Sequence, residues 1–198
     1  MKKKIVIVDY GVGNLWSLEM AFEACGIVPA ISADPEVLSA ADALILPGVG
    51  SFEAGMRGLR ERGLVETVKN FAASGKAMLG ICLGAQLLMS KGYEFGEWEG
   101  LGIIPGTVVR FPASVKEKVP QIGWNRVSEG KKVFDAYFVH SYILVPDNLE
   151  HRFGVTEYGE FQFCSSVKKG RVYGVQFHPE KSGSIGLTIL KNFIGLIR

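Results

Sequence analysis

The sequence predicts a doubly wound α/β fold with a mostly parallel sheet and added antiparallel hairpins. Short, wholly apolar runs alternate with segments of helical periodicity through residue 89, which is typical of parallel strands buried on both faces. The second half instead contains short strand-like segments broken by Gly, Pro and Asp-Asn. No repeat, linker or low-complexity tract divides the chain, so we expect a single domain over residues 1–198.

The first half supplies the parallel strands and most of the helices. Asn14 suits the N-cap of a helix that Gly26 would end, and Asp34-Pro35-Glu36 places a cap, an N1 proline and a first-turn acid in order. We expect strands at residues 5–8, 28–31, 43–46 and 77–79, and helices at 15–25, from 34, at 52–62 and at 64–73.

The second half supplies hairpins, one last strand and a final helix. We expect strands within residues 108–111, 132–145, 154–166 and 172–177, and a helix over 185–197. In doubly wound sheets, ligands bind at the carboxyl ends of the strands. Asn14, the loop over residues 47–50, and Cys82 would therefore share one edge of the sheet.

Composition narrows the function classes. Twenty-two basic and 20 acidic residues leave a net charge of +2, which favours neither nucleic acid nor a membrane surface. Gly11 and Gly13 are reminiscent of a dinucleotide fingerprint, but Trp16 occupies its third position, so we expect no such cofactor. Three cysteines cannot pair completely and their spacing suits no zinc site, so we expect no metal.

The N-terminus and the hydropathy favour a cytoplasmic protein. Basic residues follow Met1, but the apolar run Ile5–Val8 is stopped at once by Asp9, which argues against a signal peptide. No apolar run approaches the length that spans a membrane. A reducing cytoplasm is therefore the expected location.

The stretch Gly80–Gln86 has the form of a nucleophile elbow with sulfur as the nucleophile. A buried strand precedes Cys82, and helical spacing follows it. Glycines permit the sharp turn, and a helix beginning at Leu83 would direct free N–H groups at the sulfur and at an oxyanion. The alternative is a buried cysteine that only packs.

A cysteine nucleophile needs a base and a group that orients the base. His178 follows an apolar strand, and Pro179 biases it toward an extended conformation. Side chains two apart in extended chain share a side, so Glu180 would lie on the same face as His178. His140 reads as a packed histidine within a strand and His151 as an exposed loop residue. His178 and Glu180 are therefore the candidate partners of the cysteine.

With these residues in view, the chain resembles the class I (triad) glutamine amidotransferases, and more closely the glutaminase subunits of imidazole glycerol phosphate synthases. The elbow and the His-x-Glu motif are shared across the class, whereas Pro-Gly-Val-Gly and Gly-Trp-Asn favour the histidine-biosynthesis subunits. The matching stretches span almost the whole chain, at residues 9–15, 46–52, 80–86, 123–125, 138–142 and 176–182. Gln121-Ile122 and Ser141 depart from the commoner residues.

The resemblance implies the flavodoxin-like sheet of the amidotransferase fold and a thioester mechanism. Glutamine would be hydrolysed to glutamate and ammonia by a triad of Cys82, His178 and Glu180. The amides of Leu83 and of Val49 or Gly50 would form the oxyanion hole. By motif position, the implied substrate-binding residues are Gly50, Gln86, Glu94, Ser141 and Tyr142.

The resemblance also implies a partner, a (β/α)₈-barrel cyclase. This partner would use the ammonia to make imidazole glycerol phosphate and an aminoimidazole carboxamide ribotide. Four residues match positions at that interface, namely Asn14, Trp124, Tyr137 and Lys181. We further hypothesise that the isolated glutaminase is off, because the Gly48-Val49-Gly50 loop can rest with its oxyanion donor turned away.

Three alternatives stay open at this point. The chain could be a thiol hydrolase or peptidase of the same fold that acts alone. It could be a non-catalytic scaffold, which the intact Cys82, His178 and Glu180 argue against. It could also be a glutaminase that serves another acceptor, such as the pyridoxal phosphate pathway.

Overall fold

The computed structural model describes residues 3–197, and thirteen strands within this part join one sheet. Its main path runs β2-β1-β3-β4-β13-β12-β10-β7-β5-β6. The first five strands of this path are parallel to one another: β2 (Ala30–Ser32), β1 (Ile5–Val8), β3 (Ala43–Leu46), β4 (Ala77–Ile81) and β13 (Val172–Val175). This is the flavodoxin-like order, in which the chain reverses direction across the sheet between β1 and β3.

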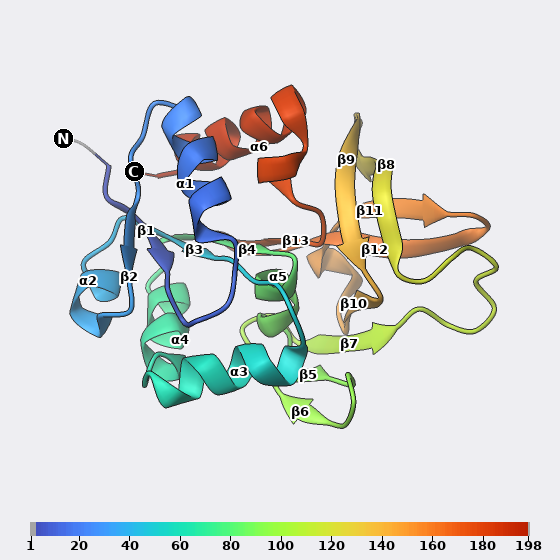
Figure 1. The fold of residues 1–198 in the computed structure, drawn as a ribbon, viewed down its shortest axis with the longest axis horizontal. Helices are drawn as coiled ribbons and strands as arrows, with labels where there is room; N and C mark the ends of the chain where they lie inside the picture. The colour runs from blue at the N-terminus through green and yellow to red at the C-terminus, as the bar shows by residue number, and fades with distance from the viewer. Residues whose placement is uncertain (1–2, 198) are drawn as a thin grey trace.

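Helices cover both faces of the parallel half (Figure 1). One face carries α1 (Leu15–Ala24) and α6 (Gly183–Gly195), and the other carries α2 (Pro35–Ser39), α3 (Phe52–Glu61), α4 (Val65–Ala73) and α5 (Leu83–Leu87). The strand side chains alternate between two cores. Ile5 and Ile7 pack with Phe22 of α1, whereas Val6 and Val8 belong to the core under α3 and α4. Apolar residues on both faces explain why these strands lack polar alternation.

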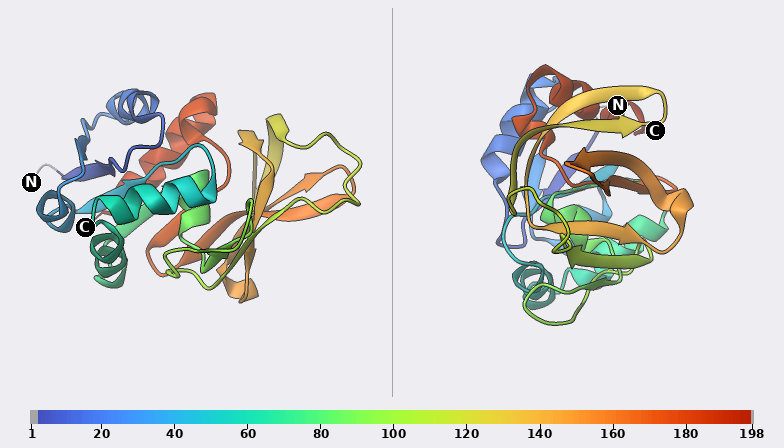
Figure 2. Two further views of the ribbon diagram at one scale, coloured as in Figure 1. Left: turned by 60° about the horizontal axis from the view of Figure 1, so that its bottom comes forward. Right: turned by 90° about the vertical axis from the view of Figure 1, so that its right-hand side faces the viewer.

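Antiparallel strands extend the sheet to one side of this layered half (Figures 1 and 2). They are β5 (Lys91–Gly92), β6 (Trp98–Glu99), β7 (Gly106–Arg110), β8 (Gln121–Glu129), β9 (Lys132–His140), β10 (Tyr142–Pro146), β11 (Arg152–Tyr158) and β12 (Phe161–Lys169), with short 3₁₀ turns η1 (Leu149–His151) and η2 (Pro179–Lys181). The β8–β9 hairpin leaves the main path and pairs with β11. Within this region, only the pairing of β5 with β7 is parallel.

The fold class is as predicted, while several boundaries differ. Strand β2 begins two residues later than expected, because Gly26 and the segment after it still belong to the turn. The expected strand over 132–145 is two strands that separate at Ser141. Strand β8 was not predicted, because Gln121–Glu129 alternates half-buried and exposed residues without an apolar run. The helix after Cys82 is one short element that ends at Leu87.

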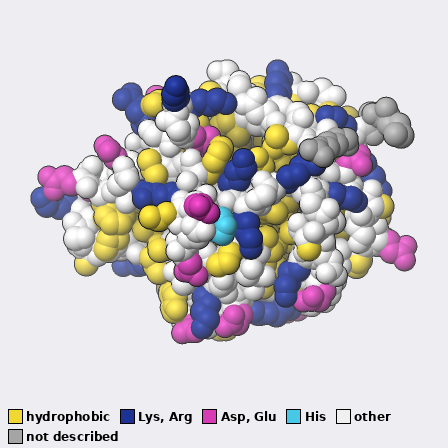
Figure 3. Space-filling model, turned by 180° about the vertical axis from the view of Figure 1, so that it is seen from behind, with side chains coloured by type: hydrophobic (Ala, Val, Ile, Leu, Met, Phe, Trp, Pro, Cys, Tyr) yellow, Lys and Arg dark blue, Asp and Glu magenta, His cyan; other side chains and the backbone are white. Residues whose placement is uncertain are grey.

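No helix in residues 3–197 is long and apolar enough to cross a membrane. On the face drawn in Figure 3, acidic and basic side chains are interspersed rather than gathered into a patch of one sign. This distribution matches the nearly balanced composition.

Candidate active site

A pocket of about 370 Å³ lies at the carboxyl ends of the parallel strands. It collects side chains and backbone from six separate parts of the chain, which are Val49, Gly50, Cys82, Leu83, Gln86, Glu94, Pro120, Val139, His140, Ser141, Tyr142, His178 and Lys181. Every expected oxyanion-hole and substrate-binding residue is in this set, together with the expected nucleophile and base. The sheet edge proposed from strand order is therefore where the candidate residues meet.

Cys82 sits on strained backbone between β4 and α5. Its φ of 53° and ψ of −111° are rare for a residue with a side chain, and such strain persists only where the surroundings enforce it. Close packing around the elbow holds Cys82 in this conformation. A Cβ added to Gly84 would lie 1.8 Å from the carbonyl oxygen of Leu46, and one added to Gly80 would lie 2.7 Å from that of Gly84. The glycines therefore let β3 and the elbow approach to backbone contact.

His178 and Glu180 form a buried pair beside this cysteine. The Nδ1 atom of His178 lies 2.7 Å from Oε1 of Glu180, and their side chains are 4% and 3% exposed. The sequence placed Glu180 beside His178 by assuming an extended backbone, and this assumption was wrong. Only His178 is extended, whereas Pro179–Lys181 forms η2, so a tight turn brings the carboxylate back to the ring. The other carboxylate oxygen, Oε2, has no partner within the described part of the chain.

The environment of His178 favours its charged form. Burial alone lowers the pKa of His178, but its hydrogen bonds and charge interactions with Cys82 and Glu180 outweigh burial and raise the pKa to about 9. An imidazolium is thus favoured at neutral pH when the sulfur is a thiolate. Because Glu180 occupies Nδ1, the remaining nitrogen, Nε2, is free for the sulfur.

The loop over residues 47–50 lies against the elbow. A Cβ added to Gly48 would lie 2.7 Å from the Cβ of Leu83, so only glycine permits this approach. Gly50 has a φ of +100°, a left-handed conformation that glycine adopts without strain. Val49, Gly50 and Leu83 all border the same pocket as Cys82.

The expected substrate-binding residues surround the rest of the pocket. The Nε2 atom of Gln86 donates to the carbonyl of Tyr142 at 3.2 Å. Glu94 has a contact that the sequence does not reveal, because its Oε2 accepts the amide of Phe52 at 2.7 Å. Phe52 begins α3 directly after the 47–50 loop, so this carboxylate caps the helix and still borders the pocket.

The four expected interface residues lie at the start of α1, on the β8–β9 hairpin and on η2. Asn14 is exposed and its side chain caps α1 by accepting the amide of Ser17 at 3.2 Å. The rings of Trp124 and Tyr137 pack edge to face, 6.1 Å apart, on the β8–β9 hairpin. The Tyr137 carbonyl accepts the amide of His178 at 2.9 Å, and Lys181 borders the pocket. The hairpin is thereby anchored beside the candidate base.

Two polar residues near the site were not singled out by the sequence, and a third, His140, was predicted as a packed histidine, which the structure confirms. The hydroxyl of Tyr10 donates to the carbonyl of Pro47 and holds the loop, and burial raises the pKa of Tyr10. The Nε2 atom of Gln176 donates toward the sulfur of Cys82 at 3.7 Å. His140 is buried, with its ring nitrogens 2.8 Å from the Tyr142 carbonyl and 2.7 Å from Gln121. Burial lowers the pKa of His140 to about 4.

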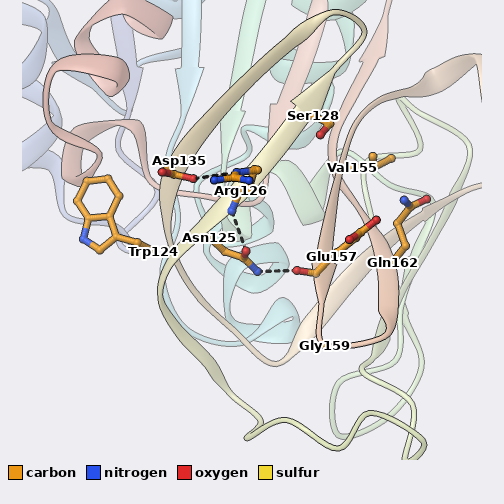
Figure 4. A pocket seen from close by; sticks show the side chains of 9 residues that line it. All are labelled: Trp124, Asn125, Arg126, Ser128, Asp135, Val155, Glu157, Gly159 and Gln162. Atoms are coloured by element: carbon orange, nitrogen blue, oxygen red, sulfur yellow. Dashed lines mark hydrogen bonds and ion pairs between the residues drawn. The ribbon is translucent and has the colours of Figure 1, made fainter.

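A larger hollow of about 570 Å³ lies elsewhere, between the β8–β9 hairpin and the β11–β12 hairpin (Figure 4). Arg126 occupies its centre with Nε 3.7 Å from Asp135, and Asn125 donates to the carbonyl of Glu157 at 2.8 Å. These groups are exposed or half-buried, and the hollow is lined by no cysteine or histidine. Residues 3–197 also contain no cluster of three His, Cys, Asp or Glu side chains that could hold a metal ion. Cys82 therefore marks the better candidate site.

Comparison with known proteins identifies a family for this chain. The family model described as glutamine amidotransferase class-I matches residues 6–196. A protein of Methanosarcina mazei described as "Imidazole glycerol phosphate synthase subunit HisH" is 49% identical over 203 residues, covering 97% of this chain and 98% of its own. The HisH subunit of Sulfurimonas denitrificans is 48% identical over 200 residues, covering 96% of each chain.

Solved structures share the fold at lower identity. One described as a glutamine amidotransferase has a TM-score of 0.78 at 22% identity and covers 97% of this chain and 98% of its own. The structure described as PurLQS from Thermotoga maritima has a TM-score of 0.79 at 19% identity and covers 100% of both chains. Together with the near-full-length relatives, these matches mean that the chain belongs to the class-I glutamine amidotransferase family, among its HisH members.

Proposed function

We propose that this chain hydrolyses glutamine at Cys82 and passes the ammonia to the cyclase subunit of an imidazole glycerol phosphate synthase, for histidine biosynthesis. The observation that carries the proposal is the strained Cys82 at the β4–α5 turn, facing the buried His178–Glu180 pair within one pocket. The family match and the HisH relatives support the same reading.

The first half of the reaction forms a thioester. The thiolate of Cys82 attacks the carboxamide carbon of glutamine, and the carbonyl oxygen becomes an oxyanion facing the amide of Leu83 and an amide of the 47–50 loop. The imidazolium of His178 then gives its proton to the departing nitrogen, which leaves as ammonia. Loss of one oxyanion donor in such a site typically raises the barrier by about 3 kcal/mol.

The second half hydrolyses the thioester, and the pKa of His178 suits this step as well. Part of the rise in its pKa comes from the charge on Cys82. Acylation removes that charge, so the pKa of His178 falls and the neutral ring can take a proton from water. Glu180 keeps Nδ1 protonated and directs Nε2 at the reacting atoms in both steps.

Glu94 and Gln86 orient the substrate in this proposal. The carboxylate of Glu94 borders the pocket and would pair with the ammonium of glutamine. The nitrogen of the Gln86 side chain is already engaged by Tyr142, which leaves its oxygen for the substrate. Ser141 and Tyr142 would complete the contacts from the β9–β10 junction.

The ammonia needs a protected route, because ammonia released into neutral water is mostly protonated and no longer a nucleophile. We infer that the partner is a (β/α)₈ barrel that docks over Asn14, Trp124, Tyr137 and Lys181, at the mouth of the pocket. The exposed Trp124, at 58%, supports this surface because such an aromatic contributes little to the isolated chain.

Glutamine hydrolysis by the purified chain tests the proposal, measured alone and with a cyclase partner carrying its ligand. Strong activation that is lost in Cys82→Ala and kept in Cys25→Ala is the expected result. Turnover that ignores the cyclase would point to another acceptor or to a hydrolase that acts alone. An absence of hydrolysis under both conditions would contradict the proposal and favour a scaffold.

A further inference from the structure

Gln176 is buried completely and stands immediately after β13, two residues before His178. Its amide is 94 residues from the cysteine in sequence, yet its Nε2 donates toward Sγ of Cys82 at 3.7 Å. Its Oε1 accepts Nε2 of Gln86 at 3.0 Å. A buried amide is costly unless both ends are paired, and here one partner is the candidate nucleophile.

We propose that Gln176 is a positioning residue that holds the sulfur of Cys82 and fixes the side-chain amide of Gln86. This inference rests on the proposed function, since it assigns a role relative to that nucleophile and that substrate-binding residue. Gln176 is absent from the pocket lining and is not expected to touch glutamine.

The contacts of the sulfur give Gln176 an electrostatic role. Besides Gln176 and His178, the carbonyl of Val139 lies 3.9 Å from Sγ and accepts the S–H of the thiol. A carbonyl dipole aimed at the sulfur disfavours the thiolate, whereas an N–H aimed at it favours the thiolate. The amide of Gln176 is a neutral donor on that sulfur, acting in addition to His178.

The second half of the role concerns Gln86. The two hydrogens of its amide are directed at the Tyr142 carbonyl and at Oε1 of Gln176, at 3.2 and 3.0 Å. With both hydrogens engaged, the oxygen of Gln86 has one orientation, toward the substrate. Without Gln176, the amide of Gln86 can rotate and present its nitrogen to the ammonium side of the substrate.

The test uses two variants of Gln176. Gln176→Met keeps the length and flexibility of the side chain but removes both polar ends, and Gln176→Glu exchanges the donor for an acceptor. Iodoacetamide alkylation of Cys82 is followed by peptide mass spectrometry from pH 5 to 10 on the full chain. The control is Ser165→Ala, since this buried hydroxyl lies on β12 beside Gln176 and has no partner within residues 3–197. No variant replaces a titratable group already around Cys82, namely His178, Glu180, Tyr10, His140, Glu94 and Lys181, and Gln176→Glu adds one carboxyl beside the sulfur.

We expect the pH midpoint of alkylation to rise by about one unit in both variants, equivalent to about tenfold slower alkylation below the midpoint. We also expect a lower kcat and a higher KM for glutamine, while Ser165→Ala matches the parent. Alkylation midpoints equal to the parent in either folded variant would overturn the inference. Alkylation does not depend on turnover, so a parent that fails to hydrolyse glutamine refutes the proposed function without deciding this test.

Discussion

Replacing Glu180 by Gln isolates the charge in the His178–Glu180 pair. The amide keeps the shape and one acceptor but loses the charge and introduces a competing donor. The pKa of His178 rises from 6.5 to about 9 despite burial, which corresponds to about 3 kcal/mol in favour of the imidazolium. Cys82 and Glu180 are the two sources of this stabilisation, so removing the charge of Glu180 removes part of it. The side chains are 4% and 3% exposed, which leaves little solvent screening.

We expect Glu180→Gln to lower kcat/KM for glutamine by about 10²- to 10³-fold with a small change in KM. Part of this loss follows from the lost charge, and the rest from an imidazole ring held in the wrong tautomer, as in other triads where the amide replacement costs up to about 10⁴-fold. The sign of the pH effect follows from the direction of the shift. With a lower pKa, His178 loses its proton at a lower pH. The alkaline limb of the pH profile of kcat/KM therefore shifts to lower pH by at least about one unit.

The assay is glutamate formation by the chain with its partner, across pH 6 to 10. Glu160→Gln is the matched control, because the side chain of Glu160 is 92% exposed and lies far from the pocket in contact with Lys116. If Glu180→Gln keeps kcat/KM within threefold of the parent and its alkaline limb does not move, the assigned role of Glu180 is refuted.

Three further predictions concern the elbow, the loop and the buried histidine. Gly84→Ala should destabilise the chain by more than about 3 kcal/mol in urea unfolding, since its Cβ would lie 1.8 Å from the carbonyl of Leu46, whereas Gly195→Ala, with open space around it, should be neutral or stabilising. Gly50→Ala should lower partner-activated hydrolysis at least tenfold but leave Cys82 alkylation unchanged, because the φ of +100° is strained for alanine; parent-like activity would count against the loop as a source of oxyanion donors. His140 has its pKa lowered to about 4, so the unfolded chain takes up its proton first as pH falls, and up to about 3 kcal/mol of stability should be lost between pH 6.5 and 4. His140→Gln should flatten that dependence in urea midpoints, and an unchanged slope would refute the assignment.

Part of the site could be predicted from local sequence because its causes are local. A buried strand, a glycine-flanked cysteine and a helix-forming segment determine the β4–elbow–α5 unit within one short stretch, residues 77–87. His178 is similar, since an apolar strand followed by His-Pro-Glu indicates a side chain at the sheet edge. Most of the parallel strands could be predicted as well, because burial on both faces leaves continuous apolar runs in the sequence, whereas β2 is largely exposed and its start was misplaced.

The antiparallel strands of the second half were harder to predict from the sequence, for a physical reason. Strand β8 presents residues to a partner strand and to solvent without a continuous apolar face, so its pattern does not differ from that of a loop. Even the His178–Glu180 contact, predicted from extended geometry, is made by a 3₁₀ turn instead. The alternation of side chains in extended backbone thus predicted that His178 and Glu180 lie together, although the backbone between them is a 3₁₀ turn.

What the sequence by itself determined is the fold class, the family and the identity of the candidate nucleophile, base and orienting acid. Tertiary structure alone decided the polar shell around them: Tyr10 on the Pro47 carbonyl, Glu94 on the amide of Phe52, and Gln176 between Gln86 and Cys82. The direction of a side-chain amide or carboxylate depends on which donors and acceptors packing brings beside it. Those partners lie 37 to 94 residues away in the chain, so no local pattern encodes them.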